Sequence, residues 1–392
     1  MEANRFGPPK DSSRRPMKPA QMSVKPYAGF SSWLSIPSYS PGHSISNDAR
    51  LQRLAWVDIC RGIGIIIVVV SHVFLLSTNP YKQFVAWGIF LFHIPLFFIL
   101  SGYFYSPSKT ADLARKRSET LLRPYAAFLI TLVAIDVAIT YARGQTLAPW
   151  QFREIATHSA LGGQFLTGKY GIFWFVTCLF LSQLAYNFVA ARCRSAMSPG
   201  VLMFVAGSCT VGYAAMYLFP GAKTPWAISC VPIAIVALWF GHLLGQTPSL
   251  NRLSVVALIC GVFLLCGVAA AAGVRFSFTM KDMNFGPPLL GIVLAMALSL
   301  ALILIAMRLQ NWQAVQWLIP VGRASLVIMF VHQFVHFTLR EMGVWRDSEL
   351  VLASLIVPFA LFFVLDRFRT LRWAFLGKAH LPVGEGNLPT AA

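Results

Sequence analysis

Charged residues are scarce in this sequence. Only 12% of its 392 residues are Asp, Glu, Lys or Arg, whereas about a quarter are charged in an average soluble domain. Hydrophobic residues make up 57% of the chain. A chain with so few charges cannot cover a water-exposed surface with polar side chains, so an ordinary soluble protein is excluded and a membrane protein is favoured.

Cysteines are also few and lack the spacing of a metal site or a disulfide framework. There are seven, mostly inside apolar segments, and we interpret them as small buried residues. His332 and His336 are four residues apart and share a helix face, but no third ligand with a helical or loop spacing accompanies them. The sequence therefore predicts no metal and no tightly bound cofactor.

Acidic residues are outnumbered, with 14 Asp and Glu against 32 Lys and Arg, which gives a net charge of +18. If Met1 lies in the cytoplasm, 21 basic residues fall in inside segments, nine fall outside and two lie within spans. This is the positive-inside distribution of a membrane protein. The basic balance therefore implies a lipid bilayer as partner and no nucleic acid.

Apolar runs long enough to cross a bilayer predict an all-α, polytopic protein of about ten transmembrane helices, with both termini in the cytoplasm. We expect a basic, Ser- and Pro-rich disordered tail at 1–49, a transmembrane domain at 50–370 and a short cytoplasmic tail at 371–392. The predicted spans are 54–77, 84–104, 121–142, 171–191, 199–219, 226–246, 252–273, 287–307, 319–339 and 349–366.

The first span concentrates polar residues where they are costly. Arg61 and His72 are eleven positions apart, so they share one helix face but lie about 16 Å apart along the axis. Asp58 precedes Arg61 by three residues and is expected to pair with it. These residues either anchor the helix end or belong to a functional site.

Two other spans place histidines in the membrane. His93 falls near the midpoint of the second span, and Pro95 is expected to kink the helix there. The ninth span carries Arg323 and His332. A buried histidine can be a packing hydrogen bond or a catalytic group, and the spacing alone leaves both open.

A basic cluster is expected just inside the second span. It contains Arg115, Arg117 and Arg123. The cluster is either a topology signal or a site for a phosphate-rich ligand.

These motifs together resemble the membrane-embedded acyltransferase family 3, especially its fucose 4-O-acetylase-like branch. The similarity covers residues 50 to about 370. Its weaker matches include Trp174, Arg323 and His332, and a departure occurs at 284–288, where relatives often have a Gly-Asn-Pro turn. The stronger matches are Asp58-x-x-Arg61-Gly62, the arginine-ten-residues-histidine motif ending at His72, Phe92-His93-x-Pro95, Ser101-Gly102-Tyr103, Arg115-x-Arg117 and Arg123-Pro124-Tyr125.

The resemblance implies a membrane O-acyltransferase that moves acetyl from acetyl-CoA to a sugar hydroxyl, on fucose or a similar sugar. The acceptor would be an exported or cell-surface glycan or glycolipid, and the location the inner membrane. His72 is the expected general base, and His93 or backbone groups near the kink are the expected oxyanion donors. Arg61 is expected to be a donor-site or relay group. Arg115, Arg117 and Arg123 would bind the acyl donor. Supporting roles are expected for Asp58, Ser101, Trp174, Arg323 and His332.

A proton-coupled transporter or flippase for a glycan or lipid is the alternative, because buried Asp, Arg and His residues can also form a proton relay. The cytoplasmic Arg-x-Arg and the paired histidine motifs favour the enzyme.

Reporter fusions test the predicted topology. Fusions after residue 50, within 105–120 and after residue 372 should report the cytoplasm, and one near residue 155 should report the outside. An outside signal from 105–120 would place the basic cluster on the wrong side for a cytoplasmic donor.

Overall fold

The computed structural model describes residues 54–247, 252–271, 273 and 276–377, and their regular structure is helical apart from one β-bridge between Thr279 and Asn284. The principal helices are α2 (Ala55–Leu75), α3 (Pro80–Phe90), α4 (His93–Tyr103), α5 (Thr110–Arg117), α6 (Arg123–Ala142), α7 (Pro149–Leu161), α8 (Trp174–Ala190), α9 (Pro199–Leu218), α10 (Val231–Gln246), α11 (Arg252–Ala271), α12 (Leu290–Leu309), α13 (Leu318–Arg323), α14 (Ser325–Glu341), α15 (Asp347–Arg367) and α16 (Arg369–Leu376).

The predicted all-helical, polytopic membrane fold is confirmed. Among the described residues, eight helices are long and apolar enough to span a bilayer, and a ninth results if α13 and α14, bent by 74°, form one span. Helix α11 covers the remaining segment of the ten that were predicted. The predicted tail at 1–49 lies outside the described residues, and α16 continues to Leu376, beyond the expected start of the C-terminal tail.

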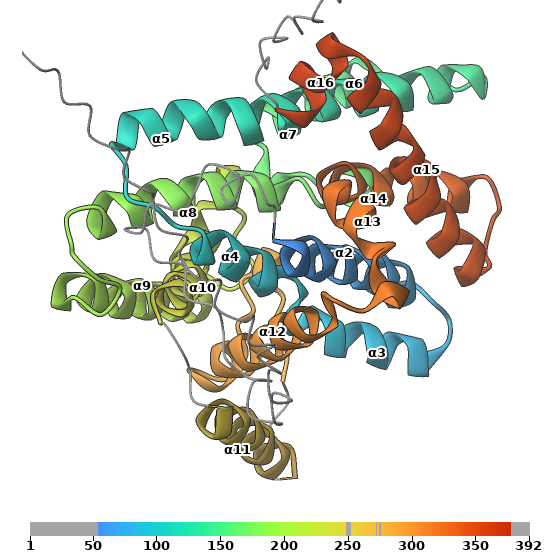
Figure 1. Cartoon of the computed structure of the whole chain (residues 1–392). Helices are drawn as coiled ribbons and strands as arrows, with labels where there is room; N and C mark the ends of the chain where they lie inside the picture. The colour runs from blue at the N-terminus through green and yellow to red at the C-terminus, as the bar shows by residue number, and fades with distance from the viewer. Residues whose placement is uncertain (1–53, 248–251, 272, 274–275, 378–392) are drawn as a thin grey trace, which may run out of the picture.

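Helix α2 lies inside the bundle. It packs against α3, α4, α12, α13, α14 and α15. Figure 1 shows α2 between these neighbours, while α5 and α6 run along one edge of the bundle and α11 lies at the opposite edge. This position surrounds the polar residues of the first span with protein rather than lipid.

Glycines allow α4 and α10 to cross with their backbones in contact. A Cβ atom at Gly102 would lie 2.0 Å from the carbonyl oxygen of Leu238, and one at Gly241 would lie 2.0 Å from that of Ile99. Small residues at such crossings are the usual device for close packing of membrane helices. The crossing fixes α4, which carries His93 as its first residue.

A second close crossing joins α2 to α13. A Cβ atom at Gly322 would lie 1.9 Å from the carbonyl oxygen of Asp58, and one at Gly62 would lie 2.5 Å from that of Leu318. The crossing therefore holds the inner part of α2 against the start of the bent pair.

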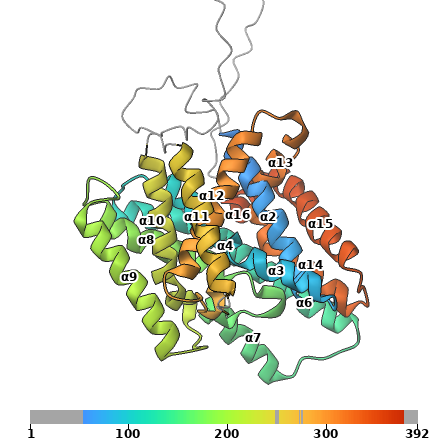
Figure 2. The same cartoon turned by 90° about the horizontal axis from the view of Figure 1, so that it is seen from below.

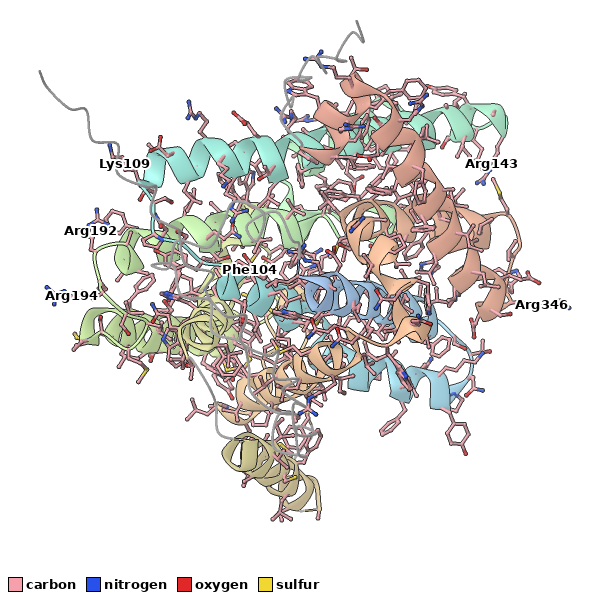
Figure 3. The ribbon with its side chains drawn as sticks, in the orientation of Figure 1. Phe104, Lys109, Arg143, Arg192, Arg194 and Arg346 are labelled. Carbon is pink, nitrogen blue, oxygen red and sulfur yellow. The ribbon has the colours of Figure 1, made fainter. Side chains whose placement is uncertain are left out.

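The two ends of the bundle carry different basic residues. Figure 3 shows Lys109, Arg192 and Arg194 at one end and Arg143 and Arg346 at the opposite end. These are the ends predicted to face the cytoplasm and the outside. Helix α7 lies at the lower end of the bundle in Figure 2, away from α13.

Two spans differ from the simple helices expected. The second is interrupted between α3 and α4, just before His93, which agrees with the kink predicted from Pro95. The third begins earlier than predicted, because α5 continues into α6 through a π-helical turn at Ser118–Leu122. The segment at 105–120 is thus largely helical rather than a loop.

Replacing Gly241 by Ala should destabilise the bundle by about 1–3 kcal/mol, because the added methyl group overlaps backbone that cannot move aside as a side chain can. Gly207→Ala, in α9, is the matched control, since a Cβ atom there meets nothing within 4 Å. Thermal unfolding in detergent measures both. Equal stability of the two variants would contradict the close crossing.

Candidate active site

Histidines from three helices meet near the end of the bundle that is predicted to face the outside. The ring centroid of His72, in the last turn of α2, lies 6.1 Å from that of His93 on α4 and 5.4 Å from that of His332 on α14. His72 and His93 line a cavity of about 220 Å³ together with Trp174 and His336. The structure therefore brings together four of the residues that the sequence singled out, His72, His93, His332 and Trp174.

Hydrogen bonds fix the tautomers of two of these rings. His93 donates from Nδ1 to the carbonyl oxygen of Ile89 at 3.0 Å, and His332 donates from Nδ1 to those of Ile328 and Met329, both at 2.9 Å. A carbonyl oxygen only accepts, so Nε2 of each neutral ring carries a lone pair. The oxyanion-donor role expected for His93 would require its doubly protonated form.

Gln333 orients His72. Its side-chain nitrogen lies 3.1 Å from Nδ1 of His72, and its side-chain oxygen is buried with no hydrogen-bond partner among the described residues. A primary amide can present either atom, so the Gln333 oxygen can accept a hydrogen bond from Nδ1–H. In that arrangement Nε2 of His72 keeps its lone pair, as a general base requires.

The end of α2 opposite His72 contains an ion pair and does not line the histidine cavity. Nε of Arg323 lies 3.4 Å from Oδ2 of the buried Asp58, which joins α13 to α2. The pairing of Asp58 with Arg61 stays a prediction. Arg61 is about 16 Å from His72 along the helix, and the described residues that line the histidine cavity do not include it.

A smaller cavity of about 30 Å³ lies toward the end that is predicted to face the cytoplasm. Ser101 and Arg117 line it, and Ser101 accepts a hydrogen bond from the side-chain nitrogen of Gln183 at 2.5 Å. Nε of Arg117 is buried and has no hydrogen-bond partner among the described residues. This cavity has room for about two water molecules, and Nε–H of Arg117 is a donor available to a polar group that reaches it.

The three arginines of the predicted donor cluster are separated in the structure. Arg115 is exposed on α5, two residues before Arg117, and helical geometry directs the two side chains to different sides. Arg123 stacks on the ring of Trp373, with its guanidinium carbon 4.3 Å from the ring centroid. Arg117 is therefore the arginine of this cluster placed in a cavity.

Sequence reasoning missed Gln333 and Lys281, both of which line the histidine cavity. Gln333 follows His332 directly, and that adjacency was a usable signal. Lys281 lies in a loop just before the 284–288 turn, and its position depends on contacts with residues more than a hundred positions away. Among the described residues, no three His, Cys, Asp or Glu side chains are grouped to hold a metal ion.

Comparison with known proteins gives one match. A family model described as an acyltransferase domain, of acyltransferase family 3, matches residues 54–365, which is more than half of the chain. No curated protein and no solved structure matches. The matched region contains α2 through most of α15, and with it both cavities. The chain therefore belongs to acyltransferase family 3.

Proposed function

We propose that this protein is a membrane O-acetyltransferase that moves acetyl from acetyl-CoA to a sugar hydroxyl of an exported or cell-surface glycan or glycolipid, in the inner membrane. The observation that carries the proposal is the outer cavity, in which His72 is exposed to a ligand and held by Gln333. Family membership supplies acyl transfer as the chemistry. Acetyl, fucose or a similar sugar, and the fucose 4-O-acetylase-like branch are part of the proposal.

The proposed reaction uses the His72 tautomer in which Nδ1–H donates to the Gln333 side-chain oxygen. Nε2 takes the proton of the acceptor hydroxyl while the hydroxyl oxygen attacks the thioester carbonyl. The tetrahedral intermediate then releases the thiolate of coenzyme A, which takes the proton back from His72. Gln333 carries no charge, so it orients the ring without adding a buried ion to the site.

The two cavities divide the substrates. In this proposal Arg117, at the inner cavity, contacts the phosphate-bearing donor from the cytoplasmic side, and the acceptor enters from the outside. The thioester arm would then extend along α2 past Arg61 to reach His72, a distance of about 16 Å along the helix axis.

The alternative, a proton-coupled transporter or flippase, needs titratable groups in sequence across the membrane. In α2 the apolar stretch Ile63–Val70 separates Arg61 from Ser71 and His72, and a relay along this helix would have to cross it. Transfer of a radiolabelled acetyl group separates the classes, since a transporter leaves the label on coenzyme A.

The test of the catalytic role is acetyl transfer from labelled acetyl-CoA to glycan, normalised to the amount of protein in the membrane. His72→Gln should insert normally and lose about a hundredfold or more in rate, as expected for loss of a general base. Gln333→Leu should show an intermediate loss with a shifted pH profile, because the ring loses its tautomer control. His158→Gln, on α7 and outside the cavity, is the control. Wild-type turnover in His72→Gln would exclude His72 as the base.

Donor binding is tested at the two neighbouring arginines. Arg117→Ala should raise KM for acetyl-CoA by about tenfold to a hundredfold, because a charge-assisted hydrogen bond contributes about 1.5–3 kcal/mol. Arg115→Ala, which removes the same charge from an exposed position, is the matched control and should change KM much less. No rise in KM for acetyl-CoA in Arg117→Ala, or an equal loss of donor use and acceptor use, would mean that the cluster serves topology only.

A further inference from the structure

Another cavity, distinct from the inner cavity at Arg117, adjoins the histidine cavity, and we call it the second cavity. Its volume is about 160 Å³, and its polar lining comprises Gln164, Thr167, Lys223, Lys281 and Asp282. Lys281 and Asp282 line both cavities. Lys281 and Asp282 therefore form the boundary between the two cavities, and a ligand in either one lies beside them.

Lys281 is a cation with carbonyl partners. Its Nζ donates to the carbonyl oxygens of Leu166 at 2.6 Å and Gly171 at 3.0 Å, and no carboxylate lies within ion-pair distance of it among the described residues. Burial, opposed by Asp282 and assisted by Lys223, lowers the pKa of Lys281 to about 8. The ammonium group is still mostly protonated at neutral pH, and it has a third N–H for a ligand.

The segment that carries Lys281 is firmly held. Gln164 donates from its side-chain nitrogen to the carbonyl oxygen of Lys281 at 2.5 Å, and its side-chain oxygen accepts from Thr224 N at 2.8 Å and Ser229 Oγ at 2.9 Å. The thiol of Cys230 donates to the carbonyl oxygen of Met280 at 3.0 Å. A site held in this way loses little freedom when a ligand binds.

The charge of the second cavity favours an anion. Lys223 and Lys281 supply two cations, and Asp282 is the one acid among the described lining residues. The positive-inside rule gives no reason for lysines here, since both are in segments predicted to lie outside. A ligand with negative charge would relieve the repulsion between the two ammonium groups.

We infer that the second cavity binds an anionic group of the acceptor, a carboxylate or a phosphate on the unit next to the sugar whose hydroxyl meets His72. This inference rests on the proposed acyl transfer for its assignment of the histidine cavity. Lys281, between the two cavities, would contact the anion with its third N–H, and Lys223 would contact it from the exposed side. The acceptor is thus an acidic or phosphorylated saccharide.

Binding of small probes tests the inference. The whole protein in phosphatidylcholine nanodiscs would be titrated with glucuronate, glucose 6-phosphate and glucose, and Kd measured by ligand-observed NMR at low salt. At least one anionic probe should bind tenfold or more tightly than glucose, and the difference should shrink as salt is added. Comparing the two anions distinguishes carboxylate from phosphate. Equal or weaker binding of both anions than of glucose would overturn the inference.

Variants locate the binding. Lys223→Gln changes an exposed side chain and should leave the fold intact, while the preference for the anion falls about tenfold. Lys281→Gln should have at least the same effect, and Lys281→Arg should restore part of it. Arg153→Gln on α7 removes a charge from the same end of the protein, lines neither cavity and should retain the preference. An unchanged preference in Lys223→Gln and Lys281→Gln would refute the assignment.

The acetyl-transfer assay on the same preparations keeps the two claims apart. If wild type transfers acetyl to glycan but shows no preference for the anions, the second cavity is wrongly assigned and the proposed function stands. If wild type transfers no acetyl to any glycan, the proposed function fails, and the inference about the acceptor fails with it whatever the probes bind.

Discussion

A polar side chain within a bilayer has no water to satisfy it, so its hydrogen-bond partners must come from the protein itself. This constraint organises the whole bundle. Nδ1 of His93 and of His332 is satisfied by carbonyl oxygens of its own polypeptide segment, His72 by Gln333, and Asp58 by Arg323 across a helix contact. These bonds use Nδ1 of each ring and leave Nε2 as the nitrogen that the proposed reaction could use on His72.

The bonds between helices require the helices to be held at fixed distances, and glycines at the helix crossings allow the close packing that fixes these distances. The backbone contacts of α4 with α10 and of α2 with α13 position the helices that carry His93 and His72. At the crossing of α2 and α13, Gly322 lies directly against the backbone of Asp58. The next residue, Arg323, pairs with the Asp58 carboxylate. Packing and ion pairing therefore stabilise the same junction.

The sequence predicted the helical membrane fold and nine of its spans to within several residues at most ends, because hydrophobic runs of bilayer length are local signals. It also predicted that His72 and His93 belong to one site. Gln333 and Lys281 were missed, since their roles arise from contacts between segments distant in the chain. The separation of Arg115 from Arg117 was missed because 105–120 was treated as a loop, and a helix directs alternate residues to different sides.

The π-helical turn at Ser118–Leu122 joins α5 to α6, and it lies directly after Arg117. Such a turn accommodates one residue more than an α-helix of the same rise would. Each residue of an α-helix corresponds to a rotation of about 100°, so this single extra residue sets the angular offset between the arginine of the inner cavity and the membrane-spanning part of α6. The extra residue thus turns the face of α5 that carries Arg117 relative to the membrane-spanning part of α6.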